Sequence, residues 1–591
     1  MNGEFVLGIW DGHDAGAALL QDGRVHFAVN EERLSRRKLE IGFPVRSIAA
    51  CLRSASLQPS DVRRIAATTS DPAKTLTRFF PLLQEEYYLI RRRKKFPESF
   101  DPLKKSFKYR FTELAPNFLS TGLSRAYFKK RLAETGLADF EFNLVDHHSA
   151  HAAGAAYCSG FRECLVLTLD GLGDGLSGSI REFRNGRLRL LKSLPARTSF
   201  GIFFEHVTNL MNMRELEDEG KVMALADYAY PVPDADNPLF GFIRTEGLDV
   251  VSDYSSTAMF REMKKVLWRY PSEQFAFMAQ RVLEKNVTDL VREAMRSTGF
   301  KNIAVSGGIF SNVKMNGKIA SLADVEHIFV FPHMGDGGLA IGAALQADGY
   351  RDNGSSPRIR DLYLGPSFTN RDVLQALGVE GEGAGSGGEW AAAPSGDVRF
   401  RILGNAAETA AHFIVGGEIV LWFQGRMEIG PRALGNRSIL ARPDDRSIKD
   451  RLNIALKRRV WYQPFCPSML LEDSPALLEL NGQDVRDNPF MTMAFKVIPR
   501  CLEDMAGVVN VDGSCRPHFL ADENPRFREL LAHVRAELGY GTVLNTSFNI
   551  HGEPLVCSPA EAIDVLKRTG IRYLFAEDIL IENIKPNPAI L

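Results

Sequence analysis

The first thirty residues alternate between short apolar runs and turns rich in glycine and acid. Residues 5–9 (FVLGI) form an apolar run typical of a buried strand, and the turn DGHD follows at 11–14. The small-residue run AGAALL, the turn DG at 22–23 and the run RVHFAVNEE predict two further strands. Because such two-residue turns join hairpin strands, the pattern predicts three consecutive strands.

Residues 164–190 repeat this plan. The strand CLVLTLD, the turn GLGDG, the strand SGSIREF, the hairpin turn Asn185-Gly186 and the strand RLRLLKSL follow one another. A chain that duplicates such a unit is expected to build two lobes, with a loop from each facing a common cleft. Backbone N–H groups in these loops can hold phosphate oxygens, and their acids can hold a cation.

Two nucleotide-binding motifs are excluded by their context. Gly173, Gly175 and Gly178 match the spacing of the dinucleotide fingerprint, but residues 179–183 alternate like a strand where that fingerprint requires a helix. The chain also lacks the GxxxxGK[ST] of a P-loop. Residues 302–320 and 328–345 instead read as strand, glycine turn and helix, an arrangement that suits a nucleotide or a metal-bound phosphate.

The domain organisation follows from two biased segments. Residues 376–397 are rich in Gly, Ala and Ser without periodicity, so they are expected to link a first domain (1–375) to a second α/β domain (398–591). Residues 80–135 stand apart as an insertion that carries Arg91-Arg92-Arg93-Lys94-Lys95 among several aromatic residues. A solvated helical insertion is one interpretation, and a docking surface for an anionic or bulky partner is the other.

Composition narrows the class further. The 591 residues exceed one ordinary core, and 72 Lys and Arg against 73 Asp and Glu give a formal net charge of -1. No overall field therefore draws the chain to nucleic acid or anionic lipid, and no apolar stretch approaches the roughly 18 residues of a membrane span. The seven cysteines are scattered without a CxxC, and the N-terminus lacks a signal core. A cytoplasmic protein is expected.

Three of the twelve histidines fall within HHSAH, residues 147–151. On a helix His147 and His151 present both imidazoles on one face, at a spacing that suits a divalent metal. Asp170 ends a buried strand and Asp336 starts a helix, so each could add an oxygen ligand. His148 lies about 100° away around the helix and is not expected to be a ligand. These donors suit Fe(II), Mn or Zn.

Six ordered motifs resemble one enzyme family, and together they span nearly the whole chain apart from the insertion and the linker. The motifs are GHDAGAAL, HHSAHAAGAAY, EGKVMALA, SGGIFSNVKMNGKI, GRMEIGPRALGNRSIL and LNTSFNIHGEP. They resemble the NodU/CmcH O-carbamoyltransferases. The resemblance implies an N-terminal TsaD-like domain of the actin/sugar-kinase (ASKHA) class, which the duplicated strand unit fits independently, and a C-terminal YrdC-like α/β domain.

The resemblance also implies a two-step reaction. The second domain would form carbamoyl-adenylate from carbamoyl phosphate and ATP, with Mg²⁺ accompanying ATP. The first domain would transfer the carbamoyl group to a small-molecule hydroxyl acceptor beside a bound metal, expected to be iron. Such enzymes tailor antibiotics and other secondary metabolites, sugars or glycolipids. No nucleic-acid partner is implied, and homo-oligomer formation stays open.

The family's functional positions can be carried over residue by residue. Its metal ligands fall on His147, His151, Asp170 and Asp336, and its catalytic histidine falls on His13, a plausible general base. Other first-domain positions near the site are Asp11, Lys38, Lys221, Gly307, Gly308 and Asn312. The second-domain positions for ATP and carbamoyl phosphate are Arg432, Arg437, Lys457, Arg459, Arg516, Asn545, Ser547 and Asn549. Gln463 stands where many members have an arginine, which could weaken ATP binding.

Four alternatives stay in view. A tRNA threonylcarbamoyl-type enzyme is disfavoured because the chain lacks a basic excess. A hydrogenase-maturation carbamoyltransferase is disfavoured because cysteine-paired zinc fingers are missing. An ASKHA-type sugar kinase would have no use for the paired histidines or for a KxR/SxN domain. A non-catalytic sensor of nucleotide and metal is disfavoured by intact motifs in both domains.

Overall fold

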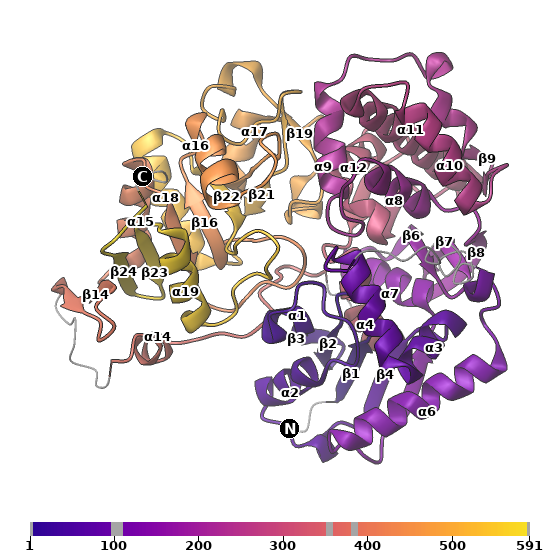
Figure 1. Ribbon diagram of the computed structural model, residues 1–591, viewed down its shortest axis with the longest axis horizontal. Helices are drawn as coiled ribbons and strands as arrows, with labels where there is room; N and C mark the ends of the chain where they lie inside the picture. Colours follow the sequence, from indigo (N-terminus) through magenta and orange to yellow (C-terminus); the bar gives the residue numbers. More distant parts are fainter. Residues whose placement is uncertain (1–3, 96–109, 350–357, 380–387, 588–591) are drawn as a thin grey trace. The chain divides into compact units, whose positions relative to one another are not determined.

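The computed structural model describes residues 4–95, 110–349, 358–379 and 388–587, drawn in Figure 1. The chain forms two compact units. The first comprises Met1–Glu31 and Leu39–Ile359, and the second comprises Glu32–Lys38 and Arg360–Leu591. Within the described part, no helix has both the length and the apolar character that crossing a bilayer requires.

The first unit begins with the predicted three-strand meander. Its sheet has the order β3-β2-β1-β4-β5, with β1–β3 antiparallel and β4 and β5 parallel to β1. The strands are β1 (Phe5–Trp10), β2 (Gly16–Gln21), β3 (Arg24–Asn30), β4 (Arg64–Thr68) and β5 (Glu141–Val145). The third strand is shorter than predicted because Glu31 opens helix α1 (Glu31–Ser35), where its carboxylate accepts hydrogen bonds from the Ser47 N–H and hydroxyl.

A second sheet repeats this topology. Its order is β8-β7-β6-β11-β12, with the same pattern of strand directions. The strands are β6 (Glu163–Gly173), β7 (Leu176–Arg184), β8 (Arg187–Pro195), β11 (Asn302–Ser306) and β12 (His327–Val330). Asn185 and Gly186 both have positive φ, as a two-residue hairpin turn requires. The duplicated-lobe ASKHA prediction is confirmed, and β7, which contains Gly178, stands where a dinucleotide fold would have a helix.

Two helices lie between these sheets. Helix α13 (Leu339–Asp348) packs on β1 and β4, helix α7 (His147–Ser159) packs on β6 and β11, and the two helices pack on each other. A Cβ at Gly342 of α13 would lie 2.0 Å from the Ala150 carbonyl oxygen of α7, so the helices meet backbone to backbone. This packing fixes the N-terminal turn of α7, which carries His147 and His151.

The other described helices of the first unit surround the two sheets. They are α2 (Val45–Ser54), α3 (Pro72–Phe79), α4 (Pro81–Arg91), α6 (Phe118–Glu134), α8 (Phe200–Leu210), α9 (Glu219–Leu225), α10 (Ser256–Leu267), α11 (Ser272–Thr298) and α12 (Val313–Ala320). A small hairpin pairs β9 (Arg244–Glu246) with β10 (Asp249–Val251).

The described part of the predicted insertion is helical, as expected. Its basic run is solvated only in part, because Arg93, Lys94 and Lys95 are exposed whereas Arg92 is buried. Arg92 pairs with Glu217, and Arg91 lies 3.4 Å from Glu205. Arg93 donates to the backbone carbonyl of Asn212. The remainder of the insertion, residues 96–109, lies outside the described residues.

The second unit is a mixed α/β domain, as predicted. Its nine-stranded sheet has the order β13-β14-β24-β23-β15-β16-β22-β17-β21, and a three-stranded sheet has the order β18-β19-β20. The strands are β13 (Ala391–Ala392), β14 (Val398–Ile402), β15 (Val420–Phe423), β16 (Arg437–Ala441), β17 (Cys466–Leu470), β18 (Leu478–Glu479), β19 (Phe495–Val497), β20 (Ser514–Cys515), β21 (His518–Leu520), β22 (Thr542–Ser547), β23 (Tyr573–Ala576) and β24 (Ile579–Asn583).

Helices α15 and α18 pack together over a core that includes Trp422, Phe575 and Leu531. The helices of this unit are α14 (Asn370–Ala376), α15 (Ala406–Val415), α16 (Ser447–Asp450), α17 (Ser474–Leu477), α18 (Pro525–Leu538) and α19 (Pro559–Thr569). The structure divides the chain between Ile359 and Arg360, ahead of the predicted boundary at 375. Strand β13 lies inside the predicted linker 376–397 and pairs with β14, which follows the linker. Residues 380–387 of the linker lie outside the described part. The functional boundaries at 375 and 398 stay predictions.

The short segment Glu32–Lys38 belongs to the second unit although it lies near the N-terminus. Arg33 donates to the Gly430 carbonyl (3.0 Å), and Arg36 donates to the Leu555 carbonyl (2.6 Å). Lys38 lies in this segment, 3.4 Å from the Glu32 carboxylate.

Candidate functional site

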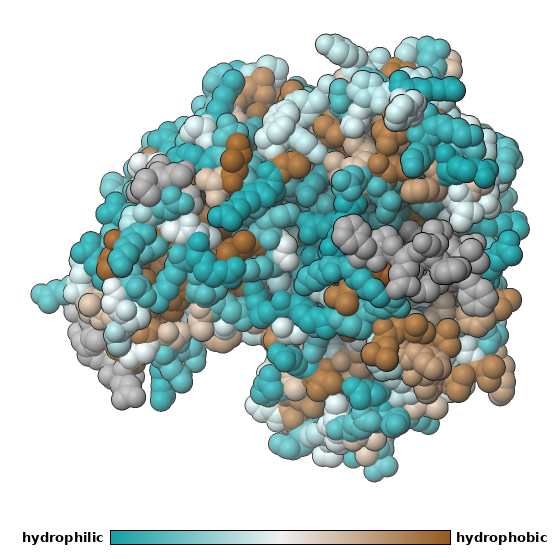
Figure 2. Space-filling view, in the orientation of Figure 1, coloured by the Kyte–Doolittle hydropathy of each residue, from teal (hydrophilic) through white to brown (hydrophobic). Residues whose placement is uncertain are grey.

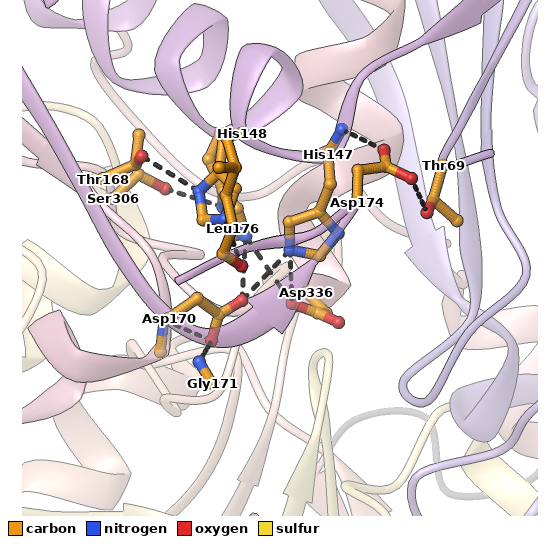
Figure 3. A network of polar contacts seen from close by, with 12 residues as sticks. Thr69, His147, His148, Thr168, Asp170, Gly171, Asp174, Leu176, Ser306 and Asp336 are labelled. Atoms are coloured by element: carbon orange, nitrogen blue, oxygen red, sulfur yellow. Dashed lines mark hydrogen bonds and ion pairs between the residues drawn. The ribbon is translucent and has the colours of Figure 1, made fainter. Parts of the chain in front are cut away.

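Two histidines and two aspartates of the first unit converge on one point. The ligand atoms of His147, His151, Asp170 and Asp336 all lie within 4.8 Å of one another. The Asp170 Oδ2 atom is 3.2 Å from His147 Nε2 and 3.3 Å from His151 Nε2. Asp336 Oδ1 lies 3.6 Å and 3.5 Å from the same two nitrogens. Figure 3 shows the His147 ring and both carboxylates directed at the same space.

Local structure explains how three distant segments reach this point. The Asp146 side chain caps α7 by accepting from the Ser149 N–H, which fixes the helix start at His147 and sets the two imidazoles one turn apart. Asp170 lies where β6 and β7 shift register. Asp336 stands in the glycine-rich turn immediately before α13.

A layer of hydrogen bonds orients these side chains. His151 Nδ1 lies 3.1 Å from Ser306 Oγ at the end of β11. The second oxygen of Asp170 accepts from the Gly171 and Gly308 N–H groups. The backbone N–H of His147 donates to the Asp174 carboxylate, which also accepts from the Thr69 hydroxyl (Figure 3). Such partners fix ring orientation at metal sites. Sequence analysis missed Asp174 and Ser306, although both stand in motifs that it singled out.

The charges of the cluster favour a cation. Burial raises the pKa of Asp170, but the hydrogen bonds and positive potential of the two imidazoles outweigh burial and lower it well below the usual range. Burial and the nearby Asp170 charge raise the pKa of Asp336 well above its usual value. Burial opposes protonation of His147, yet the two carboxylates outweigh it, so this pKa is raised. Two crowded carboxylates and two imidazoles are a donor set that fits a divalent metal.

His148 faces another direction. Its Nδ1 lies 3.0 Å from the Thr168 hydroxyl and its Nε2 lies 3.2 Å from the Leu176 carbonyl oxygen. Burial, reinforced by His147, lowers the pKa of His148 to about 3. The neutral ring is therefore part of the packing between α7 and the second sheet.

The turn after β1 brings His13 to the edge of the cluster. His13 Nε2 lies 3.4 Å from Asp336 Oδ2, and its side chain is 30% exposed, so a substrate can reach it. The Trp10 ring packs edge-on against both His13 and His147, and the Trp10 N–H donates to the His13 carbonyl. The loops of both lobes therefore meet at one place.

The Asp11 carboxylate forms a buried ion pair with Arg78. It accepts two hydrogen bonds from the Arg78 guanidinium of α3, at 2.8 and 2.9 Å. Burial alone would raise the pKa of Asp11, but Arg78 and Lys74 outweigh it and lower the pKa. This buried pair fastens the β1 turn to α3 and engages both carboxylate oxygens of Asp11.

The remaining first-domain candidates divide by position. Gly307 has a φ of 110°, and a Cβ there would lie 2.1 Å from the Leu169 carbonyl oxygen, so only glycine fits beside Asp170. Gly308 donates to Asp170. Asn312 caps α12 and exchanges hydrogen bonds with Gln280. Lys221 pairs with Asp218 (2.7 Å) on α9.

Three arginines of the second unit gather around one thiol. Arg516 donates to Cys466 Sγ through Nε (3.2 Å) and Nη2 (3.0 Å). Burial and the Arg516 charge lower the pKa of Arg432 to about 9, and burial with a smaller effect of Arg516 lowers that of Arg459 to about 10. In the described residues none of the three forms an ion pair, and Arg432 Nε and Arg459 Nη2 are buried without a hydrogen-bond partner. Such a cluster suits a polyanion.

Lys457 and the SxN segment form a second part of this region. A π-helical turn (Arg451–Leu456) leads into Lys457, whose ammonium donates to the backbone carbonyls of Ser547 (2.5 Å) and Asn549 (2.7 Å). Burial, helped by the Arg459 charge, lowers the pKa of Lys457 well below its usual value. The Ser547 hydroxyl donates to the Asn549 side chain, so these predicted residues lie together.

Comparison with known proteins now identifies the family. A model of the carbamoyltransferase N-terminus matches residues 6–345, and a model of the carbamoyltransferase C-terminus matches residues 411–583. The chain belongs to the carbamoyltransferase family.

Relatives agree with this membership. Nodulation protein NolNO of Sinorhizobium fredii is 31% identical over 98% of this chain and 80% of its own length. Nodulation protein NolO of Bradyrhizobium diazoefficiens is 32% identical over 74% of this chain and 78% of its own. The 3'-hydroxymethylcephem-O-carbamoyltransferase of Amycolatopsis lactamdurans is 30% identical over 46% of this chain and 47% of its own. The NodU/CmcH resemblance is confirmed.

The remaining predicted positions of this carbamoyltransferase differ in their surroundings. Arg437 is fully buried, stacks 3.6 Å from the Phe423 ring centre and donates to three backbone carbonyls through its two terminal nitrogens, while its Nε is buried without a hydrogen-bond partner. Gln463 Oε1 and Asn545 Oδ1 are buried without a hydrogen-bond partner. Asn545 Nδ2 donates to Ala433 and Ser468, which orients the free oxygen.

Sequence analysis also missed Cys466 and Glu428. The Cys466 sulfur is the acceptor shared by both Arg516 donors. Glu428 is fully buried and accepts from the Leu434 and Arg437 N–H groups, which holds the loop that carries Arg432. Glu428 lies in the quoted motif GRMEIGPRALGNRSIL and Cys466 lies three residues after Gln463, but nothing in a linear pattern shows which carboxylate or thiol turns inward.

Proposed function

We propose that this carbamoyltransferase is an ATP-dependent O-carbamoyltransferase. The observation that carries the proposal is the convergence of two imidazoles and two carboxylates beside His13. The matched C-terminal family region and the cephem relative, which is named as a carbamoyltransferase acting on a hydroxymethyl group, support transfer to oxygen.

The second unit would activate the carbamoyl group. Carbamate is a poor electrophile until its oxygen carries a good leaving group, and adenylation provides one. Carbamoyl phosphate and ATP bring several negative charges, which Arg432, Arg459 and Arg516 can receive because no carboxylate of the described residues neutralises them. Lys457 is held by carbonyls of the SxN segment and would reinforce the same site. Water would release phosphate from carbamoyl phosphate, and the oxygen of the resulting carbamate would attack the α-phosphorus of ATP. Pyrophosphate leaves as that bond forms, and carbamoyl-adenylate remains.

The first unit fits a resident divalent cation. His147, His151, Asp170 and Asp336 would hold it, and iron is the proposed metal. When bound, such a cation supplies Lewis-acid charge beside the adenylate phosphate, while Mg²⁺ would accompany ATP. Ser306 would keep the His151 imidazole oriented, whichever metal is present, and Asp174 would hold the start of α7 by accepting from the backbone N–H of His147.

His13 would be the base of the transfer step. The acceptor hydroxyl gives its proton to the imidazole as its oxygen attacks the carbamoyl carbon, and the bond from that carbon to the AMP oxygen breaks. Asp336 lies 3.4 Å from His13 Nε2 and would stabilise the imidazolium that forms. The reaction therefore yields a carbamate ester and AMP.

The acceptor class would be a hydroxylated natural product, sugar or glycolipid. Nodulation proteins and cephem carbamoyltransferases are among the relatives, so secondary metabolism, including antibiotic biosynthesis, is the proposed setting. ATP as co-substrate and seven free cysteines favour the cytoplasm.

The two half-reactions can be measured separately. The purified enzyme should release pyrophosphate from ATP only when carbamoyl phosphate is added. His13→Gln should retain this release while transfer to a hydroxyl acceptor falls by on the order of 100-fold or more. Arg516→Gln should lose pyrophosphate release itself, and exposed Arg500→Gln, which carries the same charge change, is its control.

Three outcomes would contradict the proposal. Release of ADP with a phosphorylated sugar would support a kinase. Full transfer by His13→Gln would remove its role as the base. Normal pyrophosphate release by Arg516→Gln would remove the arginine cluster from adenylation.

A further inference from the structure

Nine large apolar side chains are exposed on one part of the first unit. They come from α3, α4, α6 and the turns beside them, and we call them the insertion patch: Leu76, Phe79, Phe80, Leu82, Leu83, Leu114, Phe118, Leu119 and Leu123. Figure 2 shows hydrophobic residues gathered over the place where Figure 1 labels α3, α4 and α6. An exposed apolar patch of this extent normally marks an interaction site.

Packing between the helices makes the insertion patch continuous. The Thr75 and Ser124 hydroxyls lie 2.8 Å apart where α3 meets α6, and the Phe79 ring packs edge-on against Tyr127. Leu76 follows Thr75 and Leu123 precedes Ser124 in the chain, so both exposed leucines lie beside this helix contact. Helix α4 follows α3 after a single residue, which brings Leu82 and Leu83 beside Phe80.

Helix α6 presents an inverted amphipathic pattern. Its buried side chains are Ser120, Ser124, Phe128 and Leu132, each four residues from the next. The opposite face carries Phe118, Leu119 and Leu123 in its first turns, and Lys129 and Lys130 near its end. Exposed apolar side chains can enter a membrane interface while lysines beside them keep their ammonium groups at the headgroups.

The shape and the charge of the insertion patch favour a bilayer over a folded partner or a small ligand. Phe118 is 95% exposed and Leu82 is 85% exposed, so these side chains project from the surface and do not line a pocket. Residues 72–95 and 110–134 contain twelve Lys and Arg against four Glu. Several of these cations pair with acids elsewhere in the unit, such as Arg78 with Asp11 and Arg92 with Glu217, so the charge available to a bilayer is that of the exposed lysines. The lysines Lys129 and Lys130 have no hydrogen bond or ion pair in the described part of the chain, which leaves both for phosphate headgroups.

We propose that the insertion patch docks the enzyme on an anionic lipid surface. The apolar side chains enter the interface between headgroups and acyl chains, and the neighbouring lysines bind lipid phosphates. This binding is peripheral and needs no spanning helix.

The insertion patch adjoins the transfer site within the same unit. A Cβ at Gly175 would lie 3.0 Å from the Ala115 carbonyl oxygen and 3.3 Å from that of Thr112, so the segment before α6 covers the β6–β7 turn. The neighbouring Asp174 accepts from the His147 N–H. This step rests on the proposed function. The acceptor hydroxyl would be carried by a membrane lipid, which the insertion patch presents beside the metal ligands.

Vesicle co-sedimentation of the full-length protein tests the docking. Wild type should bind vesicles of phosphatidylcholine with phosphatidylglycerol, and bind phosphatidylcholine alone more weakly. The triple variant Leu82→Ser, Phe118→Ser and Leu119→Ser should reduce the partition coefficient by at least about tenfold. Trp268→Ser removes an equally exposed aromatic (91% exposed) from α10's C-terminal end and should bind as wild type.

A charge variant separates the two contributions. The double variant Lys129→Glu and Lys130→Glu should lower the partition coefficient on anionic vesicles by about tenfold or more, to the value on phosphatidylcholine alone. Its binding to phosphatidylcholine should stay unchanged. Pyrophosphate release should be normal in every variant, because none of these residues belongs to the catalytic machinery. High salt should mimic the charge variant.

Two results would overturn the docking. One is wild-type binding no stronger than that of the triple variant. The other is a wild-type dimer that the triple variant converts to monomer, with no vesicle binding, which would make the insertion patch an interface between two copies. Failure of carbamoyl transfer in protein that binds vesicles would overturn the proposed function alone and leave the docking intact.

Discussion

At the residue scale, the Asp170 carboxylate is the oxygen donor that both imidazoles share. Asp170→Asn keeps the size of the side chain but removes the charge, so we expect metal affinity to fall by on the order of 100-fold or more. Asp253→Asn is the matched control, because it makes the same substitution at a surface position of the same unit, where the side chain is 73% exposed and pairs with Arg244. Metal content after dialysis measures both variants. Equal metal content in Asp170→Asn and wild type would contradict the assignment.

A second prediction concerns His518, buried between Ser468 and the Phe527 ring. Burial lowers the pKa of His518 to about 3 from 6.5, so on acidification the unfolded chain takes up a proton that the folded chain refuses. Stability is therefore lost as pH falls below about 6.5, by about 2 kcal/mol at about pH 5.

His518→Gln should flatten this loss, while exposed His412→Gln should keep it. Urea unfolding of the full-length variants at about pH 7 and about pH 5 gives the comparison. The same steepness in His518→Gln and wild type would show that another group causes the acid sensitivity.

Predictability at this scale depends on sequence distance. His147 and His151 could be paired from the sequence because helical spacing alone sets two side chains on one face. Asp11 could not be placed, because its partner Arg78 lies 67 residues away on α3. Cys466 and Arg516 are 50 residues apart and meet only through the pairing of β17 and its neighbours.

At the element scale, the close crossing of α7 and α13 holds the imidazoles in place. Gly342→Ala would put a methyl group 2.0 Å from the Ala150 carbonyl oxygen and force the helices apart. We expect a stability loss of about 1–3 kcal/mol together with weaker metal binding, although no ligand is changed. Gly122→Ala is the matched control, since nothing lies within 4 Å of its Cβ on α6.

Melting temperature and metal titration would measure both glycine variants. Unchanged metal binding in Gly342→Ala would show that the helix crossing does not hold the metal ligands in place. Weakened metal binding in Gly122→Ala would show that the effect is not specific to that crossing. The helix crossing itself could not be predicted from the sequence. The six meander strands could, because apolar runs and Asp-Gly or Asn-Gly turns are local signals, whereas helix contacts depend on tertiary packing.

At the scale of the whole molecule, a balanced composition hides local differences. The net charge of -1 argued against lipid binding, yet the described insertion has a strong excess of basic residues beside exposed Phe118 and Leu119. Charge summed over a chain describes its field at long range, and a patch acts within about a Debye length of 10 Å. The basic run at 91–95 attracted attention in the sequence, but much of it pairs with residues such as Glu217, while Lys129 and Lys130 face solvent.

The two compact units should unfold as separable transitions that answer to different ligands. A ligand that binds only the folded state stabilises it by about 2.7 kcal/mol at 100 times its Kd, which corresponds to a shift of roughly 3–8 °C for units of this size. In calorimetry of the full chain, a divalent metal should raise one transition, and ATP with carbamoyl phosphate should raise the other. Asp170→Asn should abolish only the first shift and Arg516→Gln only the second, each serving as the control for its counterpart. A single transition that moves with both kinds of ligand, or a metal shift that survives in Asp170→Asn, would mean that the metal cluster and the arginine cluster do not belong to independent folding units.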